Sequence, residues 1–340
     1  MLPERILYMT TSRIYQKKNN FTVFKELTKR HFLVFFKSKI TVLYTLMVPI
    51  IVLVIYILFL RELEFSSVKS VLDEYNIAIS QVNGLEKGIN SVIDSWMMGG
   101  ILSLTSITVS IQTNYIFVRD KDSGINRDFA SSPINNNILI CSYFVFNFLV
   151  TLMIDILFLF VCLFYLGVNG EFYLNFVDFL AILGTIILSV GSATLITIFL
   201  CSFIKKENSL SSIIAIFSTA AGFLIGAYMP MSMLPKFVAN ICGFLPGTYA
   251  TGLFRYSFLQ TPFANLQTIL ANVENGPQLI EAVQANFGFN IDFFGLTINP
   301  SYMVLILIIS IVIFALINVG VASNLTHTKD RIMSRKKSNR

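Results

Sequence analysis

The sequence predicts an all-α integral membrane protein with six transmembrane helices. The chain of 340 residues is 55% apolar and only 13% charged, whereas a soluble domain carries about twice that charged fraction. Its apolar runs reach the roughly 20 residues that a helix needs to cross a bilayer. Because these runs are continuous rather than alternating, they predict helices and not the strands of a barrel. The expected spans are 40–60, 96–118, 138–166, 179–203, 210–229 and 301–323.

The region before the first span, residues 1–39, is predicted to be a cytoplasmic segment that ends in an amphipathic helix. Apolar and aromatic side chains recur at helical spacing over residues 21–39, while lysines and arginines lie largely apart from them. This pattern is typical of a helix that lies in the headgroup plane and contacts membrane lipid. His31 falls on this helix and has no acidic or cysteine partner at metal-ligand spacing, so we interpret it as an interfacial residue.

The distribution of positive charge predicts the orientation of the chain. Twenty of the 25 lysines and arginines fall before the first span, in the second and fourth connections, or in the tail 324–340. Cytoplasmic segments carry this excess, so both termini of the six-span region 40–323 are expected in the cytoplasm of a bacterium. The basic tail is expected to contact anionic lipid headgroups rather than nucleic acid.

Two connections are predicted to lie outside the cytoplasmic membrane. Residues 61–95 are polar and mildly acidic, and residues 230–300 are longer. In the second, three prolines divide apolar pieces of about ten residues, which are too short to span. Such pieces are expected to form short re-entrant helices in the outer leaflet, followed by a polar external part over 263–298. The three prolines are Pro230, Pro235 and Pro246.

A charged cluster, RDKDSGINRDFASSP, occupies residues 119–133 between the second and third spans. Ile125 and Phe129 are four residues apart, which predicts a short helix with one apolar spot. Pro133 is expected to end it, with Ser132 as the cap of the next helix. Two interpretations of this cytoplasmic segment follow from the residues alone: a docking surface for a soluble partner, or a solvated loop.

Three segments together resemble the permease subunit of type 2 ABC exporters, the ABC-2 type transporter family. They are FKELTKRHFLVFFKSK before the first span, RDKDSGINRDFASSPI after the second, and MPMSMLPKFVANICGFLPGTYATGLFRYSF after the fifth. The resemblance implies that the second segment is a coupling helix that meets an ATPase, and that the third closes the outer end of the pathway. Where the family often has Asn-Pro, this chain has Leu245-Pro246. The implied coupling residues are Asp120, Asp122, Gly124, Arg127, Asp128, Phe129 and Pro133.

The chain itself has no sequence signature of an ATP-hydrolysing enzyme. It contains no G-x-x-x-x-G-K-[ST] motif and no Gly-Lys pair, so a phosphate-binding loop is not expected. No cofactor or metal is expected in this chain. The resemblance therefore implies that ATP and Mg²⁺ bind to a separate ABC ATPase subunit. It also implies a second permease subunit, in a homodimer or a heterodimer.

Two intramembrane stripes each leave two interpretations open. Ser218, Gly222 and Gly226 form a small-residue stripe, which suits either the seam between two subunits or packing within one. Asn147, Thr151 and Asp155 form a polar stripe on the third span, which suits either a pathway wall or hydrogen bonding between helices.

The resemblance implies an exporter. The predicted spans are apolar and aromatic with few charges, which favours an amphipathic substrate. A drug-like, lipid-like or peptide molecule fits this description, and a cell-surface polysaccharide is the other exported class considered. A stand-alone secondary carrier or channel is the alternative from another class, although broken midplane helices and inverted repeats are not evident in the sequence. An immunity or sensing protein on the same scaffold would share these features.

Overall fold

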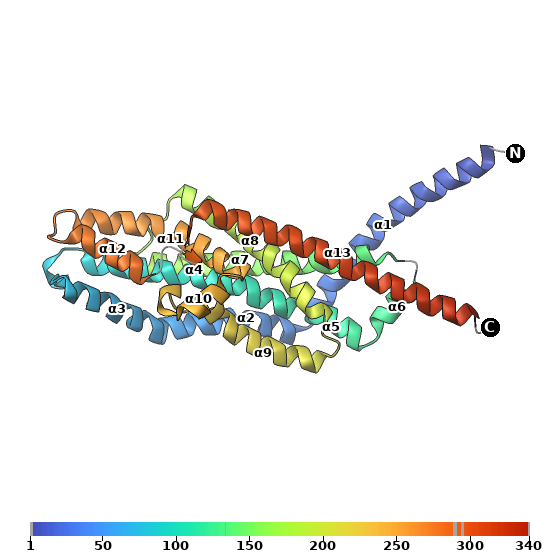
Figure 1. Cartoon of the computed structure of the whole chain (residues 1–340), viewed down its shortest axis with the longest axis horizontal. Helices are drawn as coiled ribbons and strands as arrows, with labels where there is room; N and C mark the ends of the chain where they lie inside the picture. The colour runs from blue at the N-terminus through green and yellow to red at the C-terminus, as the bar shows by residue number, and fades with distance from the viewer. Residues whose placement is uncertain (1–2, 133, 288–290, 294–295, 339–340) are drawn as a thin grey trace.

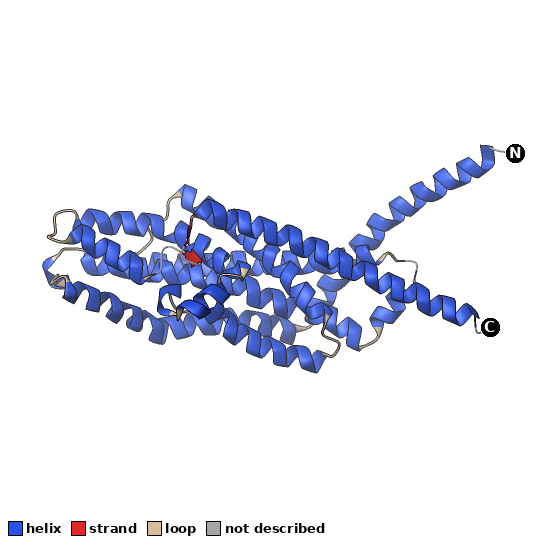
Figure 2. Cartoon of the chain, in the orientation of Figure 1, coloured by secondary structure: helices blue, strands red, loops and turns tan. Residues whose placement is uncertain are grey.

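The computed structural model describes residues 3–132, 134–287, 291–293 and 296–338, and nearly all of them are helical (Figures 1 and 2). One short antiparallel ribbon pairs β1 (Ile291–Phe293) with β2 (Leu296–Ile298). The helices are α1 (Pro3–Lys37), α2 (Lys39–Ile55), α3 (Arg61–Glu74), α4 (Leu85–Thr113), α5 (Tyr115–Asp122), α6 (Ile125–Ser131), α7 (Asn136–Val168), α8 (Phe176–Ser202), α9 (Glu207–Leu224), α10 (Lys236–Cys242), α11 (Pro246–Leu270), α12 (Gly276–Asn286) and α13 (Pro300–Ser338).

The prediction of an all-α membrane protein is confirmed. Five helices of the described chain are long and apolar enough to cross a membrane, and six if the bent pair α10–α11 counts as one span. The molecule is elongated, with both termini at one end and α3 and α12 at the other (Figure 1).

The first two spans continue well beyond their predicted outer ends. A π-helical turn, Tyr56–Leu60, joins α2 to α3 without a break, and α4 begins at Leu85. Helix therefore covers most of the predicted outer connection 61–95. The reason is local: residues 61–74 contain neither proline nor glycine, and Val68 and Leu72 are buried on one face of α3. The sequence becomes polar after Leu60 without ending the helix.

The fifth predicted span, 210–229, differs from the observed helix. α9 ends at Leu224 after 18 residues and begins with polar residues, so it is absent from the candidate spans of the described chain. α10 has seven residues, as the proline spacing suggested, and it meets α11 at 92°. α11 has 25 residues and is longer than expected, because Pro246 occupies its first turn, where a missing N–H is tolerated.

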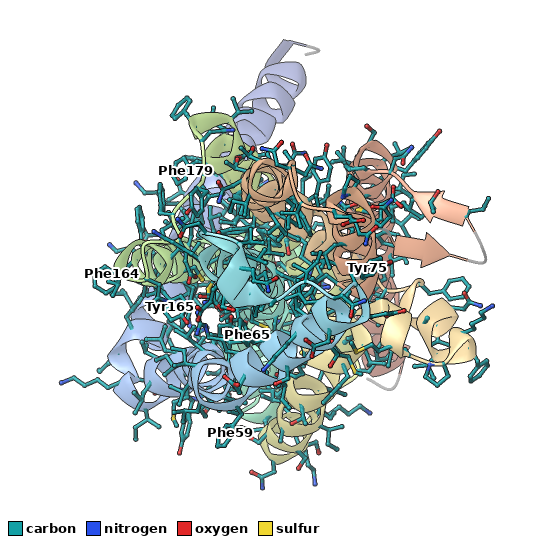
Figure 3. All side chains as sticks on the ribbon, turned by 90° about the vertical axis from the view of Figure 1, so that its left-hand side faces the viewer. Phe59, Phe65, Tyr75, Phe164, Tyr165 and Phe179 are labelled. Atoms are coloured by element: carbon teal, nitrogen blue, oxygen red, sulfur yellow. The ribbon has the colours of Figure 1, made fainter. Side chains whose placement is uncertain are left out.

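α4 forms the centre of the molecule. In its apolar window, 94% of the residues are buried, and α2, α7, α8, α9 and α11 all pack against it. Lipid-facing aromatic residues lie on the outer helices instead. Phe59 and Phe164 are 63% and 73% exposed, and both lie at the periphery when the molecule is viewed from the α12 end (Figure 3). Buried residues around α4 thus hold the helices whose outer faces suit hydrocarbon.

Candidate functional site

The charged cluster folds into two short helices joined by a left-handed glycine. Gly124 ends α5 and starts α6 with φ of 81°, a conformation that costs glycine nothing and other residues about 1 kcal/mol or more. The helix predicted from Ile125 and Phe129 is therefore present, and Asp128 is exposed on it. The side chain of Arg127, and Pro133 as a whole, lie outside the described residues.

Asp120 lies at the base of this cluster and is only 2% exposed. Arg30 of α1 donates to both carboxylate oxygens, with Nη2 at 2.8 Å from Oδ1, and the Tyr143 hydroxyl of α7 donates at 2.5 Å. The carboxylate next to Arg30 also raises the pKa of that guanidinium. Three helices, α1, α5 and α7, are thus joined through one buried carboxylate. Asp120 belongs to this internal junction rather than to an exposed docking face.

His31 reinforces the same junction from α1. Its ring stacks on Tyr143 with centroids 4.0 Å apart, and its Nε2 lies 3.1 Å from the Ser142 hydroxyl. The side chain is completely buried, which lowers the pKa of the imidazole to about 3, so the ring is neutral at physiological pH. His31 was expected at the lipid interface, and the structure places it between α1 and α7 instead.

The end of α5 contacts the turn between α8 and α9. Lys121 donates from Nζ to the carbonyl oxygens of Cys201 and Ser202, at 3.1 and 2.8 Å, at the C-terminus of α8. Asp122 accepts the backbone N–H of Glu207 at 3.0 Å, at the N-terminus of α9. A cation therefore meets the negative end of one helix dipole, and an anion meets the positive end of the next.

Two further contacts tie this region together. Tyr115 donates its hydroxyl to the Glu207 carboxylate at 2.6 Å. Phe129 of α6 lies under the Arg30 guanidinium, 5.6 Å from it. We call Arg30, Asp120, Lys121, Asp122 and Tyr143 the inner junction. It connects α6 to α1, α7, α8 and α9.

The polar stripe of α7 faces α4 inside the protein. Asn147 donates to the Ser110 carbonyl at 2.9 Å, Thr151 donates to Asn147 at 3.0 Å, and Ser106 donates to Asp155. All three stripe residues are at most 1% exposed. In this conformation the stripe hydrogen-bonds α7 to α4, the second of the two interpretations.

The small-residue stripe does not run along a single helix. A Cβ on Gly222 would lie 2.0 Å from the Tyr228 ring, so that ring already fills the space above Gly222. Gly226 lies beyond the end of α9 with φ of 69°, while Ser218 borders a groove. Packing within the subunit thus occupies Gly222. The three prolines each precede or begin a helical turn: Pro230 before Met231–Met233, Pro235 before α10, and Pro246 in α11.

One buried cation was not predicted from the sequence. Arg255 of α11 stacks on Trp96 of α4, with its guanidinium 3.7 Å from the ring centroid, and donates to the carbonyls of Gly226 and Ala227 at 2.6 and 3.3 Å. A Cβ on Gly100 would lie 2.5 Å from the Ala227 oxygen, so α4 approaches the turn after α9 very closely. Arg255 falls in the predicted outer connection 230–300, where we expected a solvent-exposed charge.

A second ionic cluster lies near the outer end of α2 and α7. Asp94 accepts from the Tyr56 hydroxyl and from Arg61 at 3.0 Å, and Arg61 also reaches Glu171 at 3.4 Å. Glu171 follows α7 and is almost fully buried. Burial, together with neighbouring Asp94, raises the pKa of Glu171 to about 9. One arginine thus faces two carboxylates, and the more distant of them, Glu171, holds a proton at neutral pH.

A groove of about 1360 Å³ separates α2 from α9 along much of their length. Both helices pack on α4, which contributes Gln112 to the lining of the groove. Its inner end lies beside Tyr115 and Glu207, and its outer end lies beside Glu64 and Met233. The inner junction therefore holds one end of a helix, α9, that forms a wall of this groove.

The sequence pattern of the ABC-2 type transporter family matches residues 22–259. The chain belongs to this family. A search among curated proteins found no match. The matched range contains the inner junction, the groove and the first part of α11 with Arg255, so the features above belong to the family's membrane domain. As an ABC-2 member the chain is the permease component of an ABC transporter, and the family implies an ABC ATPase partner and a dimeric arrangement.

Proposed function

We propose that this chain is the membrane subunit of an exporter that moves an amphipathic molecule outward across a bacterial cytoplasmic membrane. Energy would come from ATP and Mg²⁺ bound to a separate ATPase subunit, and two permease subunits would form the pathway. Membership of the ABC-2 family supports the permease role. The excess of lysine and arginine at the end that carries the termini and α6 supports a cytoplasmic location for that end.

The observation that carries the proposal is the way α6 is attached. A helix on a flexible loop would absorb a push from a partner. Here α5 and α6 are bonded to α1 and α7 through Asp120, and to the α8–α9 turn through Lys121 and Asp122. Charge-assisted hydrogen bonds are stronger than neutral ones, and those to the buried carboxylate of Asp120 contribute about 1.5–3 kcal/mol each. Movement of α6 would therefore move α9, and with it one wall of the groove.

In this mechanism the residues of α6 and the inner junction play different parts. Asp128 and Phe129, with Arg127, would meet the ATPase, because α6 carries them beyond the junction. Gly124 would set the angle between α5 and α6. Closure of the ATPase pair would rock α1 and α9 about α4, opening the groove toward the outside past α10 and α11. A second permease subunit, identical or homologous, would complete the other side of the pathway.

The first test is to purify the chain from its host in mild detergent and to identify what accompanies it. We expect a stoichiometric partner with a G-x-x-x-x-G-K-[ST] motif and ATPase activity that responds to substrate. Reversing the charges with Arg127→Glu and Asp128→Lys should release the partner. Lys205→Glu, at an exposed position in the α8–α9 turn, is the matched control and should retain it. A chain that purifies alone and shows no nucleotide dependence would refute the proposal in favour of a carrier or channel.

A further inference from the structure

The groove between α2 and α9 has an uneven charge pattern. None of the described residues that line it is a lysine or an arginine, although the chain has 25 of them and a formal net charge of +6. Its ionisable carboxylates are Glu64 at the outer end and Glu207 at the inner end. Between them the walls are aliphatic, aromatic and methionine side chains, including Tyr44, Met47 and Phe223. Such a surface suits apolar groups and repels anions.

Several polar atoms that border the groove have no hydrogen-bond partner within the described chain. They are one carboxylate oxygen of Glu64, the amide nitrogen of Gln112 and the hydroxyl of Ser218. Gln112 and Ser218 are each only 7% exposed. An unpaired buried polar group costs about 1–3 kcal/mol, and more when it is charged, so native proteins leave few of them. Three along one groove indicate that something else satisfies them.

Arg255 acts on Glu64 electrostatically, but its guanidinium already has other partners. It stacks on Trp96 and donates to the carbonyls of Gly226 and Ala227. Burial raises the pKa of Glu64 and Arg255 offsets part of that rise through space, but among the described residues Glu64 has no ion pair within 4 Å. The unpaired Glu64 oxygen therefore lacks a donor that a ligand could supply.

We propose that this groove is a binding site for amphipathic molecules with a positive charge. The apolar body would lie between α2 and α9, and the cationic group would sit at Glu64. A charged donor would satisfy the unpaired carboxylate oxygen of Glu64, and a half-open apolar pocket with a few polar groups is the usual form of a small-molecule site. Tyr228 and the methionines Met229 and Met233 near Glu64 suit a cation as well, because aromatic faces attract positive charge and methionine adapts its shape. This inference rests on the proposed export function and names its substrate class.

The test uses the full chain in phosphatidylcholine nanodiscs and two probes of nearly equal shape and opposite charge. Tetraphenylphosphonium should bind saturably, and tetraphenylborate should bind at least tenfold more weakly. Glu64→Gln should weaken tetraphenylphosphonium binding roughly tenfold, the effect of about 1.4 kcal/mol. Glu64→Lys should reverse the preference between the probes. Glu62→Gln, two residues away on the same helix but exposed and outside the groove, is the matched control and should bind like the parent chain.

A steric variant tests the location independently of charge. Ala215→Trp introduces a large side chain from α9 into the groove and should abolish binding of tetraphenylphosphonium. Equal affinity for the two probes, or Glu64→Gln and Ala215→Trp proteins that bind like the parent, would overturn the inference. These measurements need no ATPase. Export could therefore hold with a different substrate class, if the partner co-purifies and the cation does not bind. Conversely, cation binding by a chain without a partner would keep the site and refute export.

Discussion

Replacing Asp120 tests whether the inner junction holds α1, α5 and α7 together. The carboxylate accepts two hydrogen bonds from Arg30 and one from Tyr143, and it is 2% exposed. Asp120→Asn keeps the shape but removes the charge, and its amide offers one acceptor oxygen to three donors. At least one donor is then left unpaired, which costs about 1–3 kcal/mol. Arg30 is 30% exposed, so solvent offsets part of the lost ion pair. We therefore expect Asp120→Asn to lower the free energy of unfolding by about 3 kcal/mol.

That loss should lower the melting temperature by about 5 °C, because the shift per kcal/mol shrinks as a chain grows. The chain contains its own reporter. Cys162, Cys201 and Cys242 are buried and become reactive toward a thiol dye on unfolding, once exposed Cys141 is replaced by serine. Asp73→Asn, the same change at an exposed position, is the control and should shift the melting temperature by less than about 1 °C.

A double-mutant cycle sharpens the test. Arg30→Met alone leaves the carboxylate of Asp120 buried without its cation, and Arg30→Met combined with Asp120→Asn should be little worse than either single change. Losses that simply add, or an Asp120→Asn protein as stable as its parent, would refute the junction. The same variant should still retain the ATPase, because α6 keeps its helix, but substrate should stimulate hydrolysis less.

Three further outcomes follow from buried groups elsewhere. Gly222→Ala places a methyl group 2.0 Å from the Tyr228 ring and should cost about 1–3 kcal/mol in thermal unfolding, whereas adding Tyr228→Ala should remove that penalty. Glu171 has a pKa raised from 4.5 to about 9. Its contribution to the free energy of unfolding is therefore full below pH 4.5 and falls as the pH rises through 9. Glu171→Gln should flatten this decline of stability with pH. Arg255→Met should cost about 3 kcal/mol, because two carbonyls lose a charged donor; a shift under 1 kcal/mol would argue against that role.

Local patterns predicted the helices near the inner junction well. Helices are present at the amphipathic spacing before Lys37 and at the four-residue spacing from Ile125 to Phe129. These helices were predictable because helical periodicity depends on residues that are close together in the sequence. The partners of the charges were not predictable in this way. Arg30 and Asp120 are 90 residues apart, and nothing in either local sequence indicates that they meet. Charged residues near a membrane face look alike in sequence, whether they bind a partner protein or each other.

Hydropathy predicted the presence of apolar helices better than the residues at which those helices end. The sequence becomes polar after Leu60, yet the helix continues to Glu74 because its residues favour helix and bury one face. Arg255 shows a limit of charge counting. Charge counting treats every arginine outside a predicted span as solvated, whereas this one is stacked on Trp96 and shielded by the turn after α9. Only the packing of α11 along α4 accounts for it.

The continuity of α4 and α5 connects these separate features into one mechanical unit. Residues Leu85–Asp122 form a 38-residue helical element, about 57 Å long at 1.5 Å per residue. Its inner part carries Asp120 and presents Gln112 to the groove, and its outer part carries Trp96 beneath Arg255. A buried helix of this length cannot shift at one end without shifting its neighbours, because packed interiors yield little. Force applied at α6 would therefore reach the groove and the outer turn through one element.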